Sequence, residues 1–172
     1  MADEARPDRR RCLSALAAAM AGLAAPPVAL SSPAAFVEWP ELDWIGAERV
    51  TRSDLKGVPV VVVFWATYCA FCKRHNARVD RLYRATDPPR LRILGVAVDS
   101  DAEGVRRYMA DTGYRFPVAL DAGMLRPQFT DRRVIPMTCL VDRNGRSGLC
   151  IPGEMAEADV LALGTLALPQ TP

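Results

Sequence analysis

The chain has 172 residues, half of them hydrophobic and 24% charged, a composition typical of one globular domain rather than of a disordered or fibrous protein. The formal net charge is only +2, from 22 basic and 20 acidic residues, so composition gives no electrostatic signal for nucleic-acid binding. A single histidine excludes a site built from several imidazoles, and five cysteines are too few for a small fold stapled by disulfides.

Residues 1–34 differ in composition from the rest of the chain. A polar start leads into Arg9-Arg10-Arg11, and an Ala- and Leu-rich run follows over residues 13–25. A helix of that length would span about 20 Å, short of the ~30 Å hydrocarbon core of a membrane. We therefore interpret residues 1–34 as a signal peptide resembling the twin-arginine type, with an uncleaved membrane anchor as the alternative. Both interpretations predict a domain over residues 35–172 that is exported to the periplasm.

Strands and helices alternate along this predicted domain. Residues 58–65 and 91–98 are continuous apolar runs, which are typical of strands buried on both faces of an α/β sheet. Helical spacing, caps and turn residues predict helices over residues 69–86, 101–112, 123–129 and 154–168. Further strands are expected over residues 116–120, in a tight hairpin of residues 137–141 and 146–151, and in an extra edge hairpin of residues 36–51.

Two cysteines three residues apart, Cys69 and Cys72, lie where the first buried strand gives way to a helix. In the first turn of a helix this spacing brings two sulfurs within bonding distance, and free amide groups with the helix dipole stabilise a thiolate. We expect Cys69 to be the exposed nucleophile and Cys72 the resolving thiol of a redox-active disulfide. Half of a zinc site or a fixed disulfide are the alternatives, but the other cysteines and His75 do not form a second zinc-ligand pair. No metal or other cofactor is predicted.

A second signal lies far downstream, where Pro136 directly precedes a predicted buried strand. Proline removes a hydrogen-bond donor from a strand ladder, so this position is unusual. A cis Ile135–Pro136 bond beside the dithiol would account for it, and the backbone of Ile135 could then pair with an extended substrate segment. The alternative is an ordinary trans proline at the start of a strand.

Together these motifs resemble the thioredoxin superfamily, and within it the exported TlpA/ResA-like thiol-disulfide oxidoreductases. The resemblance covers about residues 38–168 and is carried by residues 64–73, 96–99, 116–121 and 135–145. It implies a thioredoxin-like α/β fold, in which helices flank a central mixed sheet. It also implies an enzyme that reduces disulfides in client proteins, for example in cytochrome c maturation or metal-centre assembly, with electrons from a membrane thiol-relay protein. Trp65, Ile135 and Pro136 are then expected beside the dithiol, in substrate-binding or structural roles.

The chain departs from the pattern of this family at several positions, including the pair Ala70-Phe71 between the cysteines, where many relatives have proline directly before the second cysteine. Val63 stands where thioredoxin keeps a buried aspartate, and Ala77 replaces a proline that often kinks the helix. His75 occupies a position where relatives often carry glutamate. Two interpretations of His75 remain: a solvated helix histidine, or a modulator of proton transfer to Cys72 near neutral pH.

Two other functions are compatible with a thioredoxin-like fold. A copper-binding chaperone of this fold typically has three residues between its cysteines and a distant histidine, whereas this chain has two residues and a nearby His75. A peroxiredoxin-like peroxidase would need a Pro-x-x-x-Thr-x-x-Cys loop, but Thr67 lies only two residues before Cys69. Both functions therefore fit the motif less well than dithiol exchange.

Cys139 and Cys150 lie on opposite arms of the predicted hairpin. In regular registers around its tight turn they are diagonal neighbours, too far apart at about 7–8 Å, or point to opposite faces. Only a bulged register sets them directly opposite each other. We therefore predict buried free thiols that behave as small apolar residues.

Overall fold

The computed structural model describes residues 35–45, 49–87, 89–121 and 123–167. The predicted signal peptide or anchor, residues 1–34, lies outside these residues. Among the residues that are described, no helix is both long enough and apolar enough to cross a membrane.

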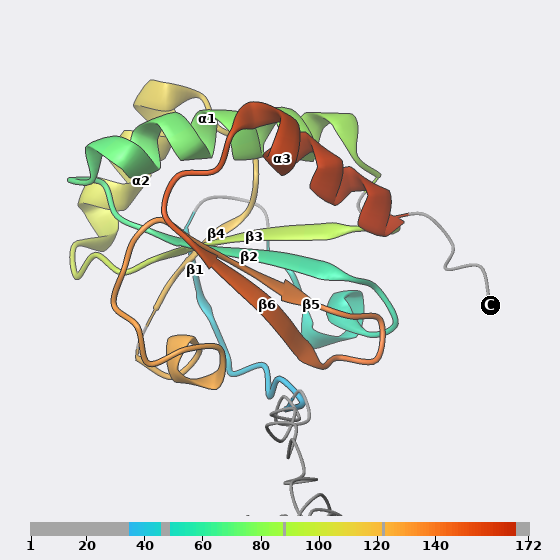
Figure 1. Ribbon diagram of the computed structural model, residues 1–172. Helices are drawn as coiled ribbons and strands as arrows, with labels where there is room; N and C mark the ends of the chain where they lie inside the picture. The colour runs from blue at the N-terminus through green and yellow to red at the C-terminus, as the bar shows by residue number, and fades with distance from the viewer. Residues whose placement is uncertain (1–34, 46–48, 88, 122, 168–172) are drawn as a thin grey trace, which may run out of the picture. The chain divides into compact units, whose positions relative to one another are not determined.

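Six strands form one mixed sheet in the order β1-β4-β3-β2-β5-β6 (Figure 1). Its centre is parallel and consists of β2 (Val60–Trp65), β3 (Arg92–Ala97) and β4 (Val118–Leu120). The helices α1 (Ala70–Ala85) and α2 (Ala102–Thr112) connect these strands in turn. All six residues of β2 are buried, as its uninterrupted apolar sequence predicts for a strand covered on both faces.

Antiparallel strands complete the sheet on both sides of this centre. β5 (Met137–Val141) pairs with β2, and β6 (Ser147–Pro152) pairs with β5 as the predicted hairpin. On the other side β1 (Asp43–Ile45) pairs with β4. The predicted central mixed sheet flanked by helices is therefore confirmed.

The predicted edge hairpin of residues 36–51 is wrong. Phe36 forms a bridge with Arg146 beside the β5–β6 turn, whereas β1 pairs at the opposite edge of the sheet. The segment between them therefore runs across the sheet instead of folding back on itself. Its apolar side chains Val37, Trp39 and Leu42 pack against one face of the sheet, and this burial decides the path of the segment.

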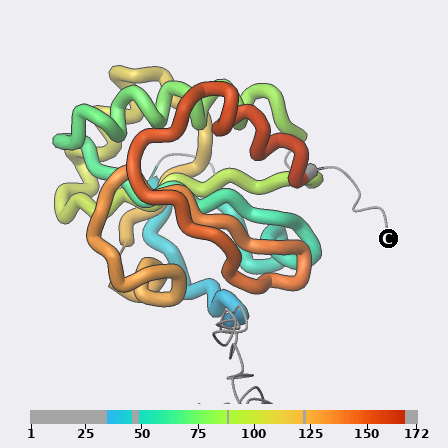
Figure 2. The backbone as a smooth tube through the Cα atoms, in the orientation of Figure 1, coloured from blue at the N-terminus to red at the C-terminus, as the bar shows by residue number. Residues whose placement is uncertain are grey.

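The two faces of the sheet are covered differently. In Figures 1 and 2 the helices α1 and α2 lie together on one face, with α3 (Glu157–Ala162) and the 3₁₀ helix η3 (Leu163–Ala167) beside α1. Val79, Val105 and Val160 of the three α-helices join one core cluster with the side chains of alternate strand residues, such as Val61 and Val63. The helical face is therefore a continuous apolar layer.

The other face is covered by turns and extended chain. The 3₁₀ helices η1 (Arg52–Leu55) and η2 (Arg126–Gln128) lie there together with the segment that precedes β1. The predicted helix over residues 123–129 is thus only a short 3₁₀ turn. Leu55 and Leu125 are buried in the second core cluster, against Val62 of β2.

The prediction that Cys139 and Cys150 are free thiols is wrong, because the two residues form a disulfide. They are direct partners in the β5–β6 register, with Cα atoms 4.1 Å apart. A register shift between Cys139 and Val141 brings the two cysteines opposite each other. This is the bulged register, which a regular hairpin does not have. The disulfide joins the second core cluster, on the face away from the helices.

Replacing both residues of this disulfide, Cys139→Ala with Cys150→Ala, should lower the free energy of unfolding by about 3 kcal/mol, the chain-entropy value for a loop this short. Denaturant titration of wild type and variant under non-reducing conditions measures the difference. Alkylation followed by mass spectrometry should find the four cysteines Cys69, Cys72, Cys139 and Cys150 protected in the oxidised protein. Free Cys139 and Cys150 thiols in folded oxidised protein would contradict the pairing.

Candidate functional site

Helix α1 begins directly after the turn that follows β2, and its first residues carry the two cysteines. Cys69 is the N-cap residue, with extended backbone angles, and its Sγ accepts a hydrogen bond from the N–H of Cys72 at 3.1 Å. Cys69 and Cys72 form a disulfide, with Cα atoms 5.1 Å apart. No acidic residue lies in the first turn, so the free N–H groups and the helix dipole favour negative charge at this end of the helix. The arrangement therefore stabilises a thiolate on Cys69.

The two sulfurs differ in accessibility. Cys72 is completely buried in the helical core cluster, whereas Cys69 is half-buried. Two large side chains beside them are open to solvent, since Tyr68 is 75% exposed and Phe71 is 59% exposed. A sulfur of another molecule can therefore reach Cys69 but not Cys72, and it would meet an aromatic rim.

The turn that carries Cys69 is fixed to the neighbouring strand. Asp99 follows β3 and accepts hydrogen bonds from both the backbone N–H and the hydroxyl of Thr67, the hydroxyl bond at 2.5 Å. Because β2 and β3 are parallel, their carboxyl ends meet at the same edge of the sheet. The Asp99 carboxylate therefore ties the dithiol turn to the end of β3.

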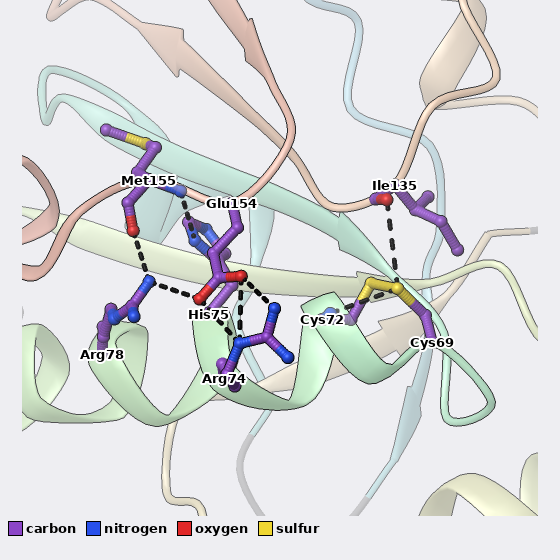
Figure 3. A network of polar contacts seen from close by, with 8 residues as sticks. All are labelled: Cys69, Cys72, Arg74, His75, Arg78, Ile135, Glu154 and Met155. Carbon is purple, nitrogen blue, oxygen red and sulfur yellow. Dashed lines mark hydrogen bonds and ion pairs between the residues drawn. A yellow bond between two sulfur atoms is a disulfide. The ribbon is translucent and has the colours of Figure 1, made fainter.

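The segment before β5 lies against the dithiol. The carbonyl oxygen of Ile135 is 3.9 Å from Cys69 Sγ, and the Ile135–Pro136 bond is cis (Figure 3). Pro136 is buried, and its carbonyl accepts a hydrogen bond from the N–H of Gly153 at 2.8 Å. Both the predicted cis bond and its position beside the dithiol are confirmed.

Trp65 lies beneath the site and does not reach its surface. It is completely buried, and its ring packs 5.3 Å from that of Tyr108. A Cβ atom on Gly95 of β3 would lie 3.0 Å from Trp65 Nε1 and 2.6 Å from the ring of Phe116, so the indole occupies space that only glycine leaves open. Two roles are expected for Trp65, substrate binding and structural support, and its complete burial fits structural support.

His75 is completely buried between α1, β5 and the connection from β6 to α3. Its Nδ1 accepts a hydrogen bond from the N–H of Met155 at 3.4 Å, which places the ring proton on Nε2. Nε2 then donates to Thr138 Oγ1 at 3.0 Å. The interpretation of His75 as a solvated helix residue is therefore wrong.

Burial determines the charge of His75. Desolvation, with a smaller contribution from Arg78, lowers its pKa to about 4, and the opposing effect of Glu154 is weaker. His75 is therefore neutral between pH 5.5 and 8, and it does not titrate where a modulator near neutral pH would have to. Its hydrogen bond to Thr138 instead positions α1 against β5.

Glu154 links α1 to the connection that precedes α3 (Figure 3). Its carboxylate accepts hydrogen bonds from Arg74, the shortest at 2.6 Å, and forms an ion pair with Arg78 at 2.7 Å. The Arg74 hydrogen bond, supported by Arg78, lowers the pKa of Glu154. Arg78 also donates to the carbonyl of Met155 at 2.5 Å, so the backbone that contacts His75 is held from both sides.

Sequence reasoning assigned no role near the dithiol to Asp99, Thr138 or Glu154. Asp99 could have been found, because it directly follows the buried strand parallel to the one that leads to Cys69. Thr138 and Glu154 act through contacts between residues 63 to 80 positions apart, which no local pattern reveals. Among the residues that the structure describes, no group of three or more His, Cys, Asp or Glu side chains could hold a metal ion.

Comparison with known proteins agrees with this geometry. The model of the AhpC/TSA family matches residues 30–146. The thiol-disulfide oxidoreductase ResA of Bacillus subtilis (strain 168) is 29% identical over 117 residues, which are 68% of this chain and 65% of that protein. The ResA protein of Halalkalibacterium halodurans is 26% identical over 129 residues, 75% of this chain and 73% of that protein. This chain therefore spans less than two thirds of the first relative.

Solved structures show the same fold. A thiol-disulfide isomerase from Corynebacterium glutamicum superposes with a TM-score of 0.69 at 22% identity, covering 80% of this chain and 98% of that one. A thioredoxin-family thiol:disulfide interchange protein from Chlorobium tepidum TLS gives the same score and identity, with coverages of 80% and 97%. A secreted Mycobacterium tuberculosis disulfide oxidoreductase gives 0.59 at 18% identity, with coverages of 73% and 92%. The fold is thus thioredoxin-like, as the motifs imply.

Replacing His75 with glutamine should flatten the pH dependence of folding stability. The pKa of His75 is about 4 in the folded protein and 6.5 in the unfolded chain, so the unfolded chain binds the proton more readily. Stability is therefore complete above pH 6.5 and declines as the pH falls toward 4, by on the order of 3 kcal/mol in total. Denaturant unfolding of the oxidised protein at pH 7, 6 and 5 measures this decline.

The matched control for this experiment is Arg81→Gln. Arg81 lies in α1 like His75, and the substitution removes its exposed ion pair with Glu157 of α3. This variant should keep the wild-type decline between pH 7 and 5. If His75→Gln declines as steeply as wild type, His75 is not the group that binds the proton.

Proposed function

We propose that this chain, which belongs to the AhpC/TSA family, is an exported thiol-disulfide oxidoreductase that reduces disulfides in client proteins. The observation that carries the proposal is the Cys69–Cys72 disulfide at the start of α1, with Cys69 accessible and Cys72 buried. The ResA relatives are thiol-disulfide oxidoreductases, which supports the same chemistry.

In the reduced protein Cys69 is the nucleophile. Its thiolate attacks one sulfur of a client disulfide, a bond forms between Cys69 and that sulfur, and the second client sulfur leaves as a thiolate. Cys72 then loses its proton and attacks Cys69 Sγ, which releases the first client sulfur. Two electrons have moved from the dithiol to the client, and the Cys69–Cys72 disulfide remains.

The environment of the two sulfurs fits this sequence of steps. The N–H of Cys72 donates to Cys69 Sγ, and the helix dipole adds to the stabilisation of the attacking thiolate. Burial of Cys72 reserves it for the second step, because only a sulfur already bonded to Cys69 is within its reach. The carbonyl of Ile135 lies 3.9 Å from Cys69 Sγ, and the backbone of an extended client could pair with this segment.

Export to the periplasm is part of the proposal. The Cys139–Cys150 disulfide, which lies apart from the dithiol on the other face of the sheet, supports an oxidising compartment. Maintaining a reduced dithiol there requires a supply of electrons, which we assign to a membrane thiol-relay protein. Candidate clients are apocytochrome c and proteins that assemble metal centres.

The Cys69→Ala variant should lose at least ~100-fold of the rate at which the reduced protein reduces a model disulfide, because the attacking thiolate is gone. The Cys72→Ser variant should accumulate a mixed disulfide between Cys69 and the client, because the resolving thiol is missing. Non-reducing gels and mass spectrometry detect the trapped species, and client proteins trapped in a periplasmic extract identify the substrate class.

A control variant that lacks the second disulfide, Cys139→Ala with Cys150→Ala, should reduce the model disulfide at the wild-type rate. Disulfide reduction by Cys69→Ala would refute the mechanism. Peroxide consumption faster than disulfide reduction would instead assign the chain to a peroxidase.

A further inference from the structure

One polar side chain of α1 is buried without a hydrogen bond. Asn76 is completely buried, and neither Nδ2 nor Oδ1 of its amide has a partner among the described residues. In the same part of the chain, the only other buried side-chain atoms without a partner are Trp65 Nε1 and the Tyr108 hydroxyl. A buried amide whose hydrogen bonds are unmade costs folding stability, so its presence calls for a functional explanation.

The other polar side chains that α1 buries are already engaged. His75 uses both ring nitrogens, and the Asp80 carboxylate accepts hydrogen bonds from Arg84 Nε and from the N–H of Arg115, each at 2.6 Å. Of the three buried polar side chains on this helix, only that of Asn76 is therefore available to a further partner.

Asn76 lies one helical turn after Cys72, on the same face of α1. Residues four apart in a helix are neighbours, with Cβ atoms about 5–6 Å apart. Helical side chains also lean toward the N-terminus of their helix, which is the direction in which Cys72 lies from Asn76. Because Cys72 is itself completely buried, the helix places an unpartnered amide next to a sulfur that solvent does not reach.

The need of Cys72 for a hydrogen bond depends on the redox state. In the disulfide its sulfur is bonded to Cys69 Sγ, and a neutral sulfur is only a weak acceptor. In the resolving step Cys72 loses its proton and becomes a buried thiolate, which is costly without a donor. The N–H of Cys72 donates to the sulfur of Cys69 and not to its own. A charge-assisted hydrogen bond from Asn76 Nδ2 would meet this need.

We propose that Asn76 is a catalytic residue of the resolving step, in which its Nδ2 donates a hydrogen bond to the Cys72 thiolate. The thiolate attacks Cys69 Sγ, the new sulfur–sulfur bond forms, and the client sulfur leaves Cys69 as a thiolate. Once Cys72 is again part of a disulfide, the amide loses its partner, which is the state that the structure shows. The inference rests on the proposed function and concerns its second step only.

The test separates the two steps with 5,5′-dithiobis(2-nitrobenzoate), mixed with an equal amount of reduced protein that lacks the other three cysteines (Cys12→Ser, Cys139→Ala, Cys150→Ala). Attack by Cys69 releases the first 2-nitro-5-thiobenzoate at a rate that depends on concentration. Resolution by Cys72 releases the second at a rate that does not. The first phase thus measures Cys69, and the second measures Cys72.

In Asn76→Leu the second phase should slow at least about threefold at pH 7, while the first changes less than about twofold. Loss of one hydrogen bond to a charged sulfur should move the midpoint of the second-phase pH profile up by about one unit. The resulting tenfold loss of thiolate is partly offset because a less stabilised thiolate is the stronger nucleophile. Above both midpoints the variant should therefore be no slower than its parent. Asn76→Ala, which removes the amide without adding bulk, should give the same shift.

Other titratable groups do not obscure this profile between pH 6 and 10. The titratable side chains that lie on the buried face of α1, or that contact its first turns or the preceding turn, are His75, Asp80, Asp99, Tyr114 and Glu154. Burial lowers the pKa of His75 to about 4 and raises that of Tyr114, and the hydrogen bond from Arg74 lowers the pKa of Glu154. Asp80 and Asp99 hold hydrogen bonds from Arg84 and Thr67.

The matched control is Tyr108→Phe, which removes another buried polar atom without a partner, but from α2. It should leave both phases unchanged. A second phase slowed by the same factor at every pH in Asn76→Leu would show that Asn76 only supports the packing of α1. An unchanged second phase would show that the amide does not act on Cys72. Absence of the first phase in the parent protein would refute the proposed function instead.

Nuclear magnetic resonance tests the contact without changing Asn76. In the same background with Cys69→Ala, Cys72 is the only thiol left. The side-chain amide resonances of Asn76 should then shift over the pH range in which Cys72 loses its proton. Those of Gln128, whose amide donates to the Glu38 carbonyl at 2.7 Å on the other face of the sheet, should stay in place. Asn76 resonances that do not move through this titration would overturn the inference.

Discussion

The hydrogen bond from the Cys72 N–H to Cys69 Sγ, at the first turn of α1, is the interaction on which the site depends. It requires that the helix begin one residue after the accessible cysteine, and the position of β2 sets that point. β2 is paired with β3 on one side and β5 on the other, so it cannot shift along the sheet without breaking both ladders. The Asp99 carboxylate then fixes the turn between β2 and α1. The sulfur chemistry at the surface is thus supported by the most buried strand of the protein.

Where the resemblance to thioredoxin implies a buried aspartate this chain has Val63, and the buried polar group lies on the neighbouring strand instead. Val63 of β2 is buried and apolar, but its direct partner in the β5 ladder is Thr138, which bonds to His75. This pair joins α1 to β5, and the N–H of Met155 donates a hydrogen bond to the other ring nitrogen of His75. Because burial keeps His75 neutral, this arrangement satisfies a buried polar contact without placing a charge near Cys72. Both ring nitrogens of His75 already have hydrogen-bond partners, so neither is free to contact Cys72.

What could be predicted from the sequence was local. The runs 58–65 and 91–98, the cysteine pair and Pro136 each carry their signal in a few neighbouring residues, and the fold follows from their order. The Cys139–Cys150 disulfide was not predicted because it depends on one register shift between β5 and β6. The amino-acid composition does not reveal such a shift. The burial of His75 was missed because it depends on Met155 and Thr138, which approach α1 only in the folded chain.

Two different kinds of contact constrain the segment that precedes β5. Its last residues, Ile135 and Pro136, are fixed by the sheet and by the dithiol, and they were accessible to sequence reasoning. The preceding residues 132–134 are contacted by Arg126, whose guanidinium donates to the carbonyls of Arg132 and Val134 and lies over the ring of Phe64. The first constraint sets the geometry beside Cys69, and the second acts on backbone carbonyls farther from the sulfur. The backbone that runs beside Cys69 is therefore held in part by residues that never touch sulfur.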